Sequence, residues 1–108
     1  MRRVLFDENL PGKLRGDLPD LEVVTVAEAG WRGIRNGELL KLAEAAFDAF
    51  LTADRNLPHQ QTVASLQLGV VVLQIGSTKL HDLRGQAPRI AQALHAVAPG
   101  EVLVVKRT

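Results

Sequence analysis

Five short apolar segments alternate along the chain with segments that have the spacing of helices. The fourth segment, residues 70–75, is a continuous apolar run of the kind that is buried on both faces in a parallel sheet. The predicted strands are residues 3–7, 22–26, 49–52, 70–75 and 101–105. Strands that alternate with helices predict an α/β fold with a doubly wound, mainly parallel five-stranded sheet and right-handed crossovers.

Helical periodicity and the breakers proline and glycine predict the segments between the strands. Apolar residues recur with helical spacing from Asn36 onward, and Gly69 ends the helix before the fourth strand. The predicted helices are residues 11–18, 36–46, 57–68 and 80–97, the last with a break around residues 85–88. Residues 27–35, which include Trp31, are predicted to form a loop.

Length and composition indicate one ordinary globular domain over residues 1–108. A formal net charge of +1 gives no overall attraction to nucleic acid, so any basic surface must be local. The absence of cysteine excludes disulfides and zinc–thiolate sites and fits a reducing compartment. No segment approaches the roughly 20 apolar residues that cross a bilayer, so we expect a cytoplasmic protein without membrane contact.

Three acidic residues stand where this topology would bring them to one edge of the sheet. Asp7 ends the first strand, Asp54 follows the third, and Glu38 lies near the start of the intervening helix. Two carboxylates 4 Å apart repel by roughly 1 kcal/mol in water and about 4 kcal/mol at an effective dielectric of 20. The pattern therefore predicts a bound divalent cation, Mg²⁺ or Mn²⁺. Glu8, adjacent to Asp7, is a further candidate at this edge.

Each acid also has a structural interpretation. Asp7 precedes a predicted helix, and its carboxylate would cap that helix or stabilise its positive N-terminal end. Glu38 would stabilise its own helix in the same way from the first turn. Asp54-Arg55-Asn56 has the composition of a turn or a helix cap. The chain has no P-loop, no dinucleotide fingerprint and no serine elbow, and its histidines lack metal-ligand spacing. These absences leave the acidic residues as the main chemical signal.

Three arginines flank the same predicted edge of the sheet. Arg32 and Arg35 lie in the predicted loop before the second helix, and Arg55 follows Asp54. Arginines in such a rim can bind backbone phosphates of a nucleic acid, although ordinary surface charge explains any single one.

Three stretches of the chain carry a resemblance to a known family. They are VLFDENLP at residues 4–11, NGELLKLA at residues 36–43 and LTADRNLP at residues 51–58. At these residues the chain resembles the PIN-like proteins of the DUF5615 family, which are relatives of the PIN ribonuclease domains of VapC-type toxins. Residues 60–61, 70–73 and 99–102 fit as well, so the resemblance spans almost the whole chain.

The resemblance implies a PIN-like fold with a metal-dependent nuclease site. Asp7, Glu38 and Asp54 would be the catalytic residues and metal ligands, with Thr52 and Asn56 as polar supports. Asn36 stands where many relatives have an acid, which leaves Glu38 as the one acid at the start of that helix. The resemblance thus predicts a Mg²⁺- or Mn²⁺-dependent endoribonuclease, the toxin of a toxin–antitoxin pair, with RNA as substrate, an antitoxin as partner and a homodimer as assembly.

Two other functions also fit the sequence. A phosphoacceptor receiver domain would use acids after the first strand, Asp54 after the third, Ser77 or Thr78 after the fourth and Lys106 after the fifth. A binding module could instead have kept the PIN-like fold and lost catalytic activity. Only the nuclease hypothesis needs Glu38 for metal binding.

Overall fold

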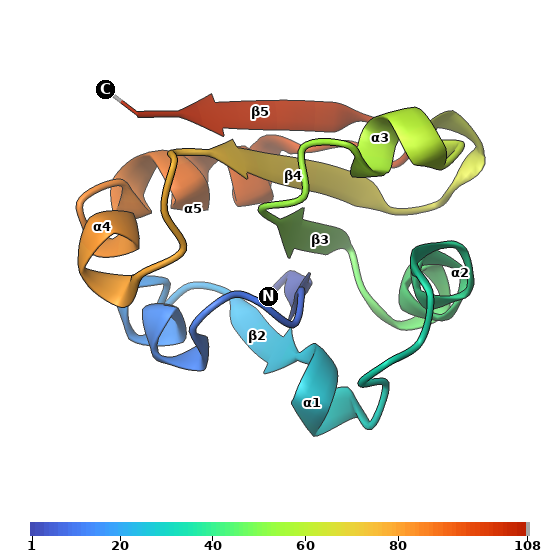
Figure 1. Cartoon of the computed structure of the whole chain (residues 1–108), viewed down its shortest axis with the longest axis horizontal. Coiled ribbons are helices and arrows are strands. Elements are labelled where there is room, and N and C mark those ends of the chain that lie inside the picture. The colour runs from blue at the N-terminus through green and yellow to red at the C-terminus, as the bar shows by residue number, and fades with distance from the viewer. Residues whose placement is uncertain (108) are drawn as a thin grey trace.

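A single five-stranded sheet forms the centre of the protein. The computed structural model describes residues 1–107, with the backbone alone of Gln60. The strands are β1 (Arg3–Phe6), β2 (Glu22–Thr25), β3 (Ala49–Thr52), β4 (Gly69–Gln74) and β5 (Val102–Lys106). All neighbouring strands pair in parallel, in the order β2-β1-β3-β4-β5 (Figure 1). The predicted α/β fold with a parallel sheet is therefore confirmed.

Short helices connect the strands. The α-helices are α1 (Val26–Ala29), α2 (Asn36–Ala46), α3 (Leu57–Gln60), α4 (Leu80–Arg84) and α5 (Ala87–Ala96), and the 3₁₀ turns are η1 (Gly12–Asp17) and η2 (Val63–Ser65). The predicted helix at residues 36–46 and the break between α4 and α5 are confirmed.

Two predicted segments differ from the structure. The predicted loop 27–35 overlaps α1, because the Thr25 side chain accepts from the backbone N–H of Glu28 and the Glu28 carboxylate accepts from that of Thr25. This reciprocal capping box starts a helix that Gly30 then ends in the left-handed conformation. The predicted helix 57–68 is wrong beyond its first turn. Gln61 is extended, and the chain then forms η2.

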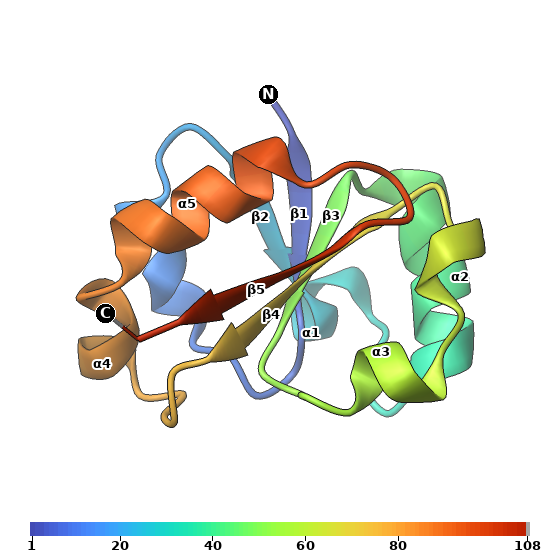
Figure 2. The same ribbon diagram turned by 90° about the horizontal axis from the view of Figure 1, so that it is seen from above.

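The helices cover both faces of the sheet. Helices α1, α2 and α3 lie on one face, and η1, α4 and α5 lie on the other (Figure 2). Alternate residues of β4 enter the two layers of the core: Val70 and Val72 pack on the α2 side, and Val71 and Leu73 pack on the α5 side. This double burial explains why β4 reads as a continuous apolar run.

The connection from β4 to β5 has the opposite hand to the others. The steps β3 to β4 and β4 to β5 run in the same direction across the parallel sheet, but the first passes over the α3 face and the second over the α5 face (Figure 2). The β4–β5 crossover is therefore left-handed. Our expectation of right-handed crossovers is wrong for this unit, although about 98% of such units are right-handed.

Burial of the sheet accounts for the exception. Without α5, the face of β3, β4 and β5 that carries Val71 and Leu73 would be covered only by η1 and the short helix α4. Ile90 and Leu94 of α5 are fully buried against it.

No helix among residues 1–107 is long and apolar enough to cross a membrane.

Two side chains cover the outer edge of β2. Glu22 donates its N–H toward β1, so the peptide groups of Val23 and Thr25 point outward. The Val23 carbonyl accepts from Arg15 Nη1 at 3.3 Å, and the Thr25 N–H donates to Glu28 Oε1 at 2.9 Å. Arg15 Nη2 also binds Glu28 Oε1 at 2.7 Å. The hydrogen bond from Arg15, and then that from Thr25, lowers the pKa of Glu28 to about 2.

This depressed pKa predicts a pH-dependent stabilisation by Glu28. The stabilisation is fully present above the ordinary pKa of 4.5 and is lost as the pH falls toward about 2. Thermal unfolding of Glu28→Gln should therefore show a lower Tm than wild type at neutral pH, with the difference vanishing near pH 2. Asp20→Asn is the control, because Asp20 is exposed and has no polar contact with the described residues. An equal effect of both substitutions would contradict the prediction.

Candidate functional site

Asp7 and Asp54 lie at the point where the strand order reverses. After β1 the chain moves to β2 on one side, and it later returns to β3 on the other side of β1. Asp7 directly follows β1 and Asp54 lies two residues after β3, at the carboxyl ends of neighbouring strands. In open α/β sheets, ligands bind in the crevice at this switch point.

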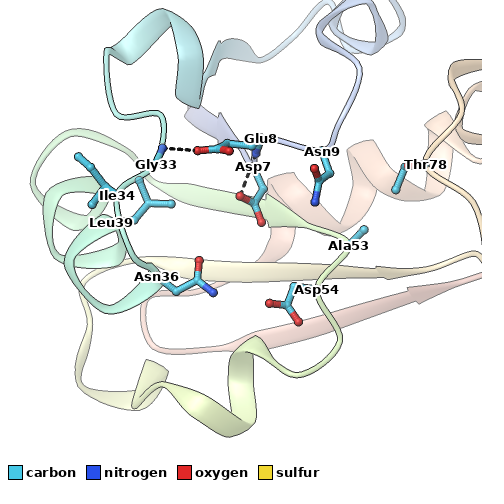
Figure 3. Close-up of a pocket in the computed structure, with 10 residues that line it drawn as sticks. All are labelled: Asp7, Glu8, Asn9, Gly33, Ile34, Asn36, Leu39, Ala53, Asp54 and Thr78. Atoms are coloured by element: carbon cyan, nitrogen blue, oxygen red, sulfur yellow. Dashed lines mark hydrogen bonds between the residues drawn. The ribbon is translucent and has the colours of Figure 1, made fainter.

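A hollow opens at this position, and we call it the central hollow. Its polar lining is Asp7, Glu8, Asn9, Asn36, Asp54 and Thr78. The side chains of Asp7, Asn9, Asn36 and Asp54 surround the same space, and they come from the segment after β1, from α2 and from the segment after β3 (Figure 3). No lysine or arginine lines the hollow among the residues that the structure describes. The hollow is therefore an acidic site without a cationic side chain of its own.

A buried hydroxyl joins the two aspartates. Thr52 Oγ1 donates to Asp7 Oδ2 at 2.7 Å and accepts from the backbone N–H of Asp54 at 3.0 Å. Thr52 has no exposed surface and is the only polar residue in the described chain that is classed as buried. The hydroxyl thus fixes the Asp7 carboxylate relative to the start of the Asp54 segment.

Local hydrogen bonds orient both carboxylates. Asp7 Oδ1 accepts from the backbone N–H of Glu8 at 2.9 Å, and Asp54 Oδ1 accepts from that of Asn56 at 2.9 Å. Asn56, predicted as a polar support, therefore acts through its backbone. Each carboxylate oxygen can accept more than one hydrogen bond or ligand contact, so both groups retain capacity toward the hollow. Two carboxylates and neighbouring amide oxygens are the hard oxygen donors that Mg²⁺ and Mn²⁺ prefer.

Glu38 does not line the central hollow. It is exposed and lines a neighbouring hollow with Arg35, Asn36 and Gln61. Two helical positions correspond to about 200° around the axis, so Asn36 and Glu38 point in nearly opposite directions from α2. In the described part of the chain, no three acidic, histidine or cysteine side chains could hold one metal ion together. The structure thus brings Asp7 and Asp54 together and places Glu38 beside them rather than with them.

Glu8 holds the segment after α1 against the site. Its Oε1 accepts from the backbone N–H of Gly33 at 2.6 Å (Figure 3). Gly33 has a positive φ of 83°, a conformation that glycine adopts at no steric penalty. Glu8 therefore positions one wall of the central hollow.

The three predicted arginines lie around the central hollow, each in a different neighbouring hollow. Arg32 shares one with Arg15, Arg35 lies beside Glu38, and Arg55 lies near Thr78. Each of these hollows shares lining residues with the central one. The site therefore has an acidic centre with guanidinium groups in the hollows around it.

Sequence reasoning missed Asn9 and assigned Thr78 only to the receiver hypothesis. Both line the central hollow. Their positions carried a signal, because Asn9 lies two residues after Asp7 and Thr78 lies four residues after the end of β4. Polar residues that soon follow a parallel strand are brought to the same edge as those of its neighbours.

Comparison with known proteins found no match to the chain among family models, curated proteins or solved structures. The geometry of the site and the resemblance at residues 4–11, 36–43 and 51–58 are therefore the observations that bear on function.

The buried hydroxyl predicts a specific loss of stability. Thr52→Val keeps the side-chain shape but leaves the partly buried N–H of Asp54 without its acceptor and removes a donor from Asp7. We expect the free energy of unfolding to fall by about 1–3 kcal/mol in denaturant titration. Thr52→Ser keeps the hydroxyl and is the matched control. If the valine variant were as stable as the serine variant, the bridging hydrogen bonds would not hold the site.

Proposed function

We propose that the protein is a Mg²⁺- or Mn²⁺-dependent endoribonuclease whose metal site is formed by Asp7 and Asp54. The observation that carries this proposal is the pair of carboxylates at the switch point of the sheet, positioned by the shared hydroxyl of Thr52. The resemblance to PIN-like proteins supplies the reaction class, and the Asp7 and Asp54 stretches are two of those that carry it.

Electrostatics favour a cation in the central hollow. Asp7, Glu8 and Asp54 bring three carboxylates to its lining, and no ion pair with a basic side chain is formed by any of them among residues 1–107. Glu8 binds the backbone of Gly33, so we assign it a positioning role, and we assign the ion to Asp7 and Asp54 at the switch point of the sheet. A divalent cation there supplies Lewis-acid activation and neutralises charge on a phosphodiester.

The other polar groups would bind and orient the substrate. Asn9 and Asn36 can donate amide N–H groups to phosphate or sugar oxygens from either side of the hollow. Arg32, Arg35 and Arg55 would bind the flanking phosphates. The formal net charge of +1 fits such local recognition better than broad nucleic-acid binding.

The biological setting of the proposal comes from the resemblance. The resemblance implies that the protein is a cytoplasmic toxin of a toxin–antitoxin pair, with RNA as substrate, an antitoxin protein as partner and a homodimer as assembly. The segment of Arg32 and Arg35, beside the central hollow, is where an antitoxin could block access to the carboxylates.

Metal binding is the first test. At a hundred times its dissociation constant, Mn²⁺ should stabilise the wild type by roughly 2.7 kcal/mol, which thermal unfolding detects readily. Asp7→Asn and Asp54→Asn should abolish this shift, and Asp54→Asn should unfold like the wild type without metal, since its amide oxygen can still accept from the Asn56 N–H. Glu38→Gln should retain most of the shift, because Glu38 lies in the neighbouring hollow.

Three results would change this assignment. Loss of the shift in Glu38→Gln would show that Glu38 is a ligand, as the resemblance implies. Absence of any shift in the wild type would favour a PIN-like binding module without catalysis. A shift without metal-dependent RNA cleavage that Asp54→Asn removes would contradict the nuclease function while keeping the metal site.

A receiver domain is the second candidate function, because two observations favour it. The strand order is that of receiver proteins such as CheY, and Thr78 lines the same hollow as Asp7 and Asp54. Two observations count against it. Lys106, the lysine after the fifth strand that the receiver hypothesis uses, does not line the hollow, and the β4–β5 crossover is left-handed, unlike the usual right-handed unit.

The nuclease proposal predicts no stable phosphorylation of Asp54. Incubation with acetyl phosphate and Mg²⁺, followed by intact mass measurement, should leave the mass of the chain unchanged. Asp54→Asn serves as the matched control. An added phosphate on the wild type that is absent from the variant would establish the receiver function instead.

A further inference from the structure

The outer edge of β5 differs from the outer edge of β2. Glu101 accepts at its carbonyl from the Val70 N–H at 2.9 Å, so the peptide groups of residues 101, 103 and 105 point to β4. Those of Val102, Val104 and Lys106 therefore point away from the sheet. Within the described residues, only the Lys106 carbonyl has a partner on this side, the Arg89 guanidinium. The edge of β2, in contrast, is covered by Arg15 and Glu28.

The left-handed crossover also leaves part of one face of β5 open. Helices α4 and α5 pack on the face that carries Leu103 and Val105 (Figure 2). Val104 points to the other face and is 45% exposed, whereas Val105 is 4% exposed. An open edge that carries an exposed valine is a template for pairing with another strand.

The sequence of this edge is complementary to itself. In antiparallel pairing of two copies about a twofold axis at Val104, Val104 faces its own equivalent and Val102 faces Lys106. The same register places Glu101 opposite Arg107, and therefore opposite charges meet on both sides of the axis. An axis centred on Val102 would instead set Glu101 opposite Leu103. Charge complementarity thus selects one register.

The existing contacts are compatible with this pairing. Glu101 Oε1 accepts from the Ala98 N–H and Arg107 Nε donates to the Ile75 carbonyl, which leaves the second carboxylate oxygen and the other guanidinium N–H groups available. The Lys106 carbonyl, bound to Arg89, has a second lone pair.

We infer that two copies of this chain associate through the edge of β5, antiparallel and centred on Val104, to form one continuous ten-stranded sheet. The pairing satisfies the outward peptide groups of Val102, Val104 and Lys106 and covers the exposed Val104 side chain. Because the two sheets run in opposite directions, their carboxyl ends face opposite ways and the two central hollows do not meet. Association is therefore independent of the proposed metal site.

Cysteine cross-linking tests the register directly, since the chain has no cysteine. Directly opposed residues in a hydrogen-bonded antiparallel pair have Cα atoms about 5.5 Å apart, within the roughly 4.4–6.8 Å of a disulfide. Val104→Cys should form a covalent dimer on mild oxidation. Val102→Cys is the matched control, because its equivalents lie four residues out of register, about 13 Å apart along the strands. Equal cross-linking of both variants would overturn the inference.

Solution mass tests the association without a cross-link. Sedimentation of the wild type without metal should give twice the chain mass of 11.7 kDa. Val104→Asp should be a folded monomer, because it places two like charges on the axis at an exposed position, and Val104→Thr should remain a dimer. A wild type that stays at 11.7 kDa up to its solubility limit would also overturn the inference. Neither result depends on metal binding or RNA cleavage.

Discussion

Burial of the central strands on both faces is the constraint from which the rest of the structure follows. Ala49, Phe50 and Leu51 of β3 and Val70, Val71 and Val72 of β4 are at most 1% exposed. A chain of 108 residues has only enough helix for two thin layers, and η1 is a short 3₁₀ turn. The α5 layer must therefore come from the connection between β4 and β5. Its apolar side chains stabilise the fold most when they cover the face that η1 leaves open.

The same arrangement positions the functional site. Strands β1 and β3 are neighbours because the chain places β2 outside β1 before it returns, and this reversal brings Asp7 and Asp54 to one edge. A buried threonine hydroxyl at the end of β3 then has two partners within reach, the Asp7 carboxylate and the Asp54 N–H. In a low-dielectric interior such a hydroxyl must be satisfied, so packing and site geometry reinforce each other.

Local sequence signals predicted the strands and the aspartates, but not the relations that depend on packing. The apolar runs locate the strands to within a residue or two, and parallel pairing then brings Asp7 and Asp54 together. Periodicity alone does not say which face α5 covers, so the hand of the last crossover was not predictable. The Thr25 and Glu28 capping box was present in the sequence as T-x-x-E and would have predicted α1.

Glu38 shows how a correct helix can still give an incomplete prediction of a site. The buried residues Leu39, Leu40 and Ala43 define the inner face of α2, whereas Glu38, Lys41 and Leu42 are exposed. A helical wheel drawn from those apolar positions places Glu38 on the solvent side and Asn36 toward the sheet edge. Asn36 thus faces the central hollow with an amide, and Glu38 lies in the neighbouring hollow.

The edges of the sheet and the carboxyl ends of its strands have different roles: the β5 edge binds a second copy, and the proposed catalytic site lies elsewhere. Edge strands expose unpaired peptide groups, and proteins usually cover them with charged side chains. This chain uses Arg15 and Glu28 for that purpose on β2, next to the hollow that Arg32 also lines. On β5 the covering contact stops at Lys106, and the opposite charges of Glu101 and Arg107 flank the open residues. Charges of one sign at these two positions would repel each other in the register centred on Val104, whereas Glu101 and Arg107 attract each other there. The β5 edge is therefore selective for its own sequence, while the carboxyl ends of the strands remain free for a substrate.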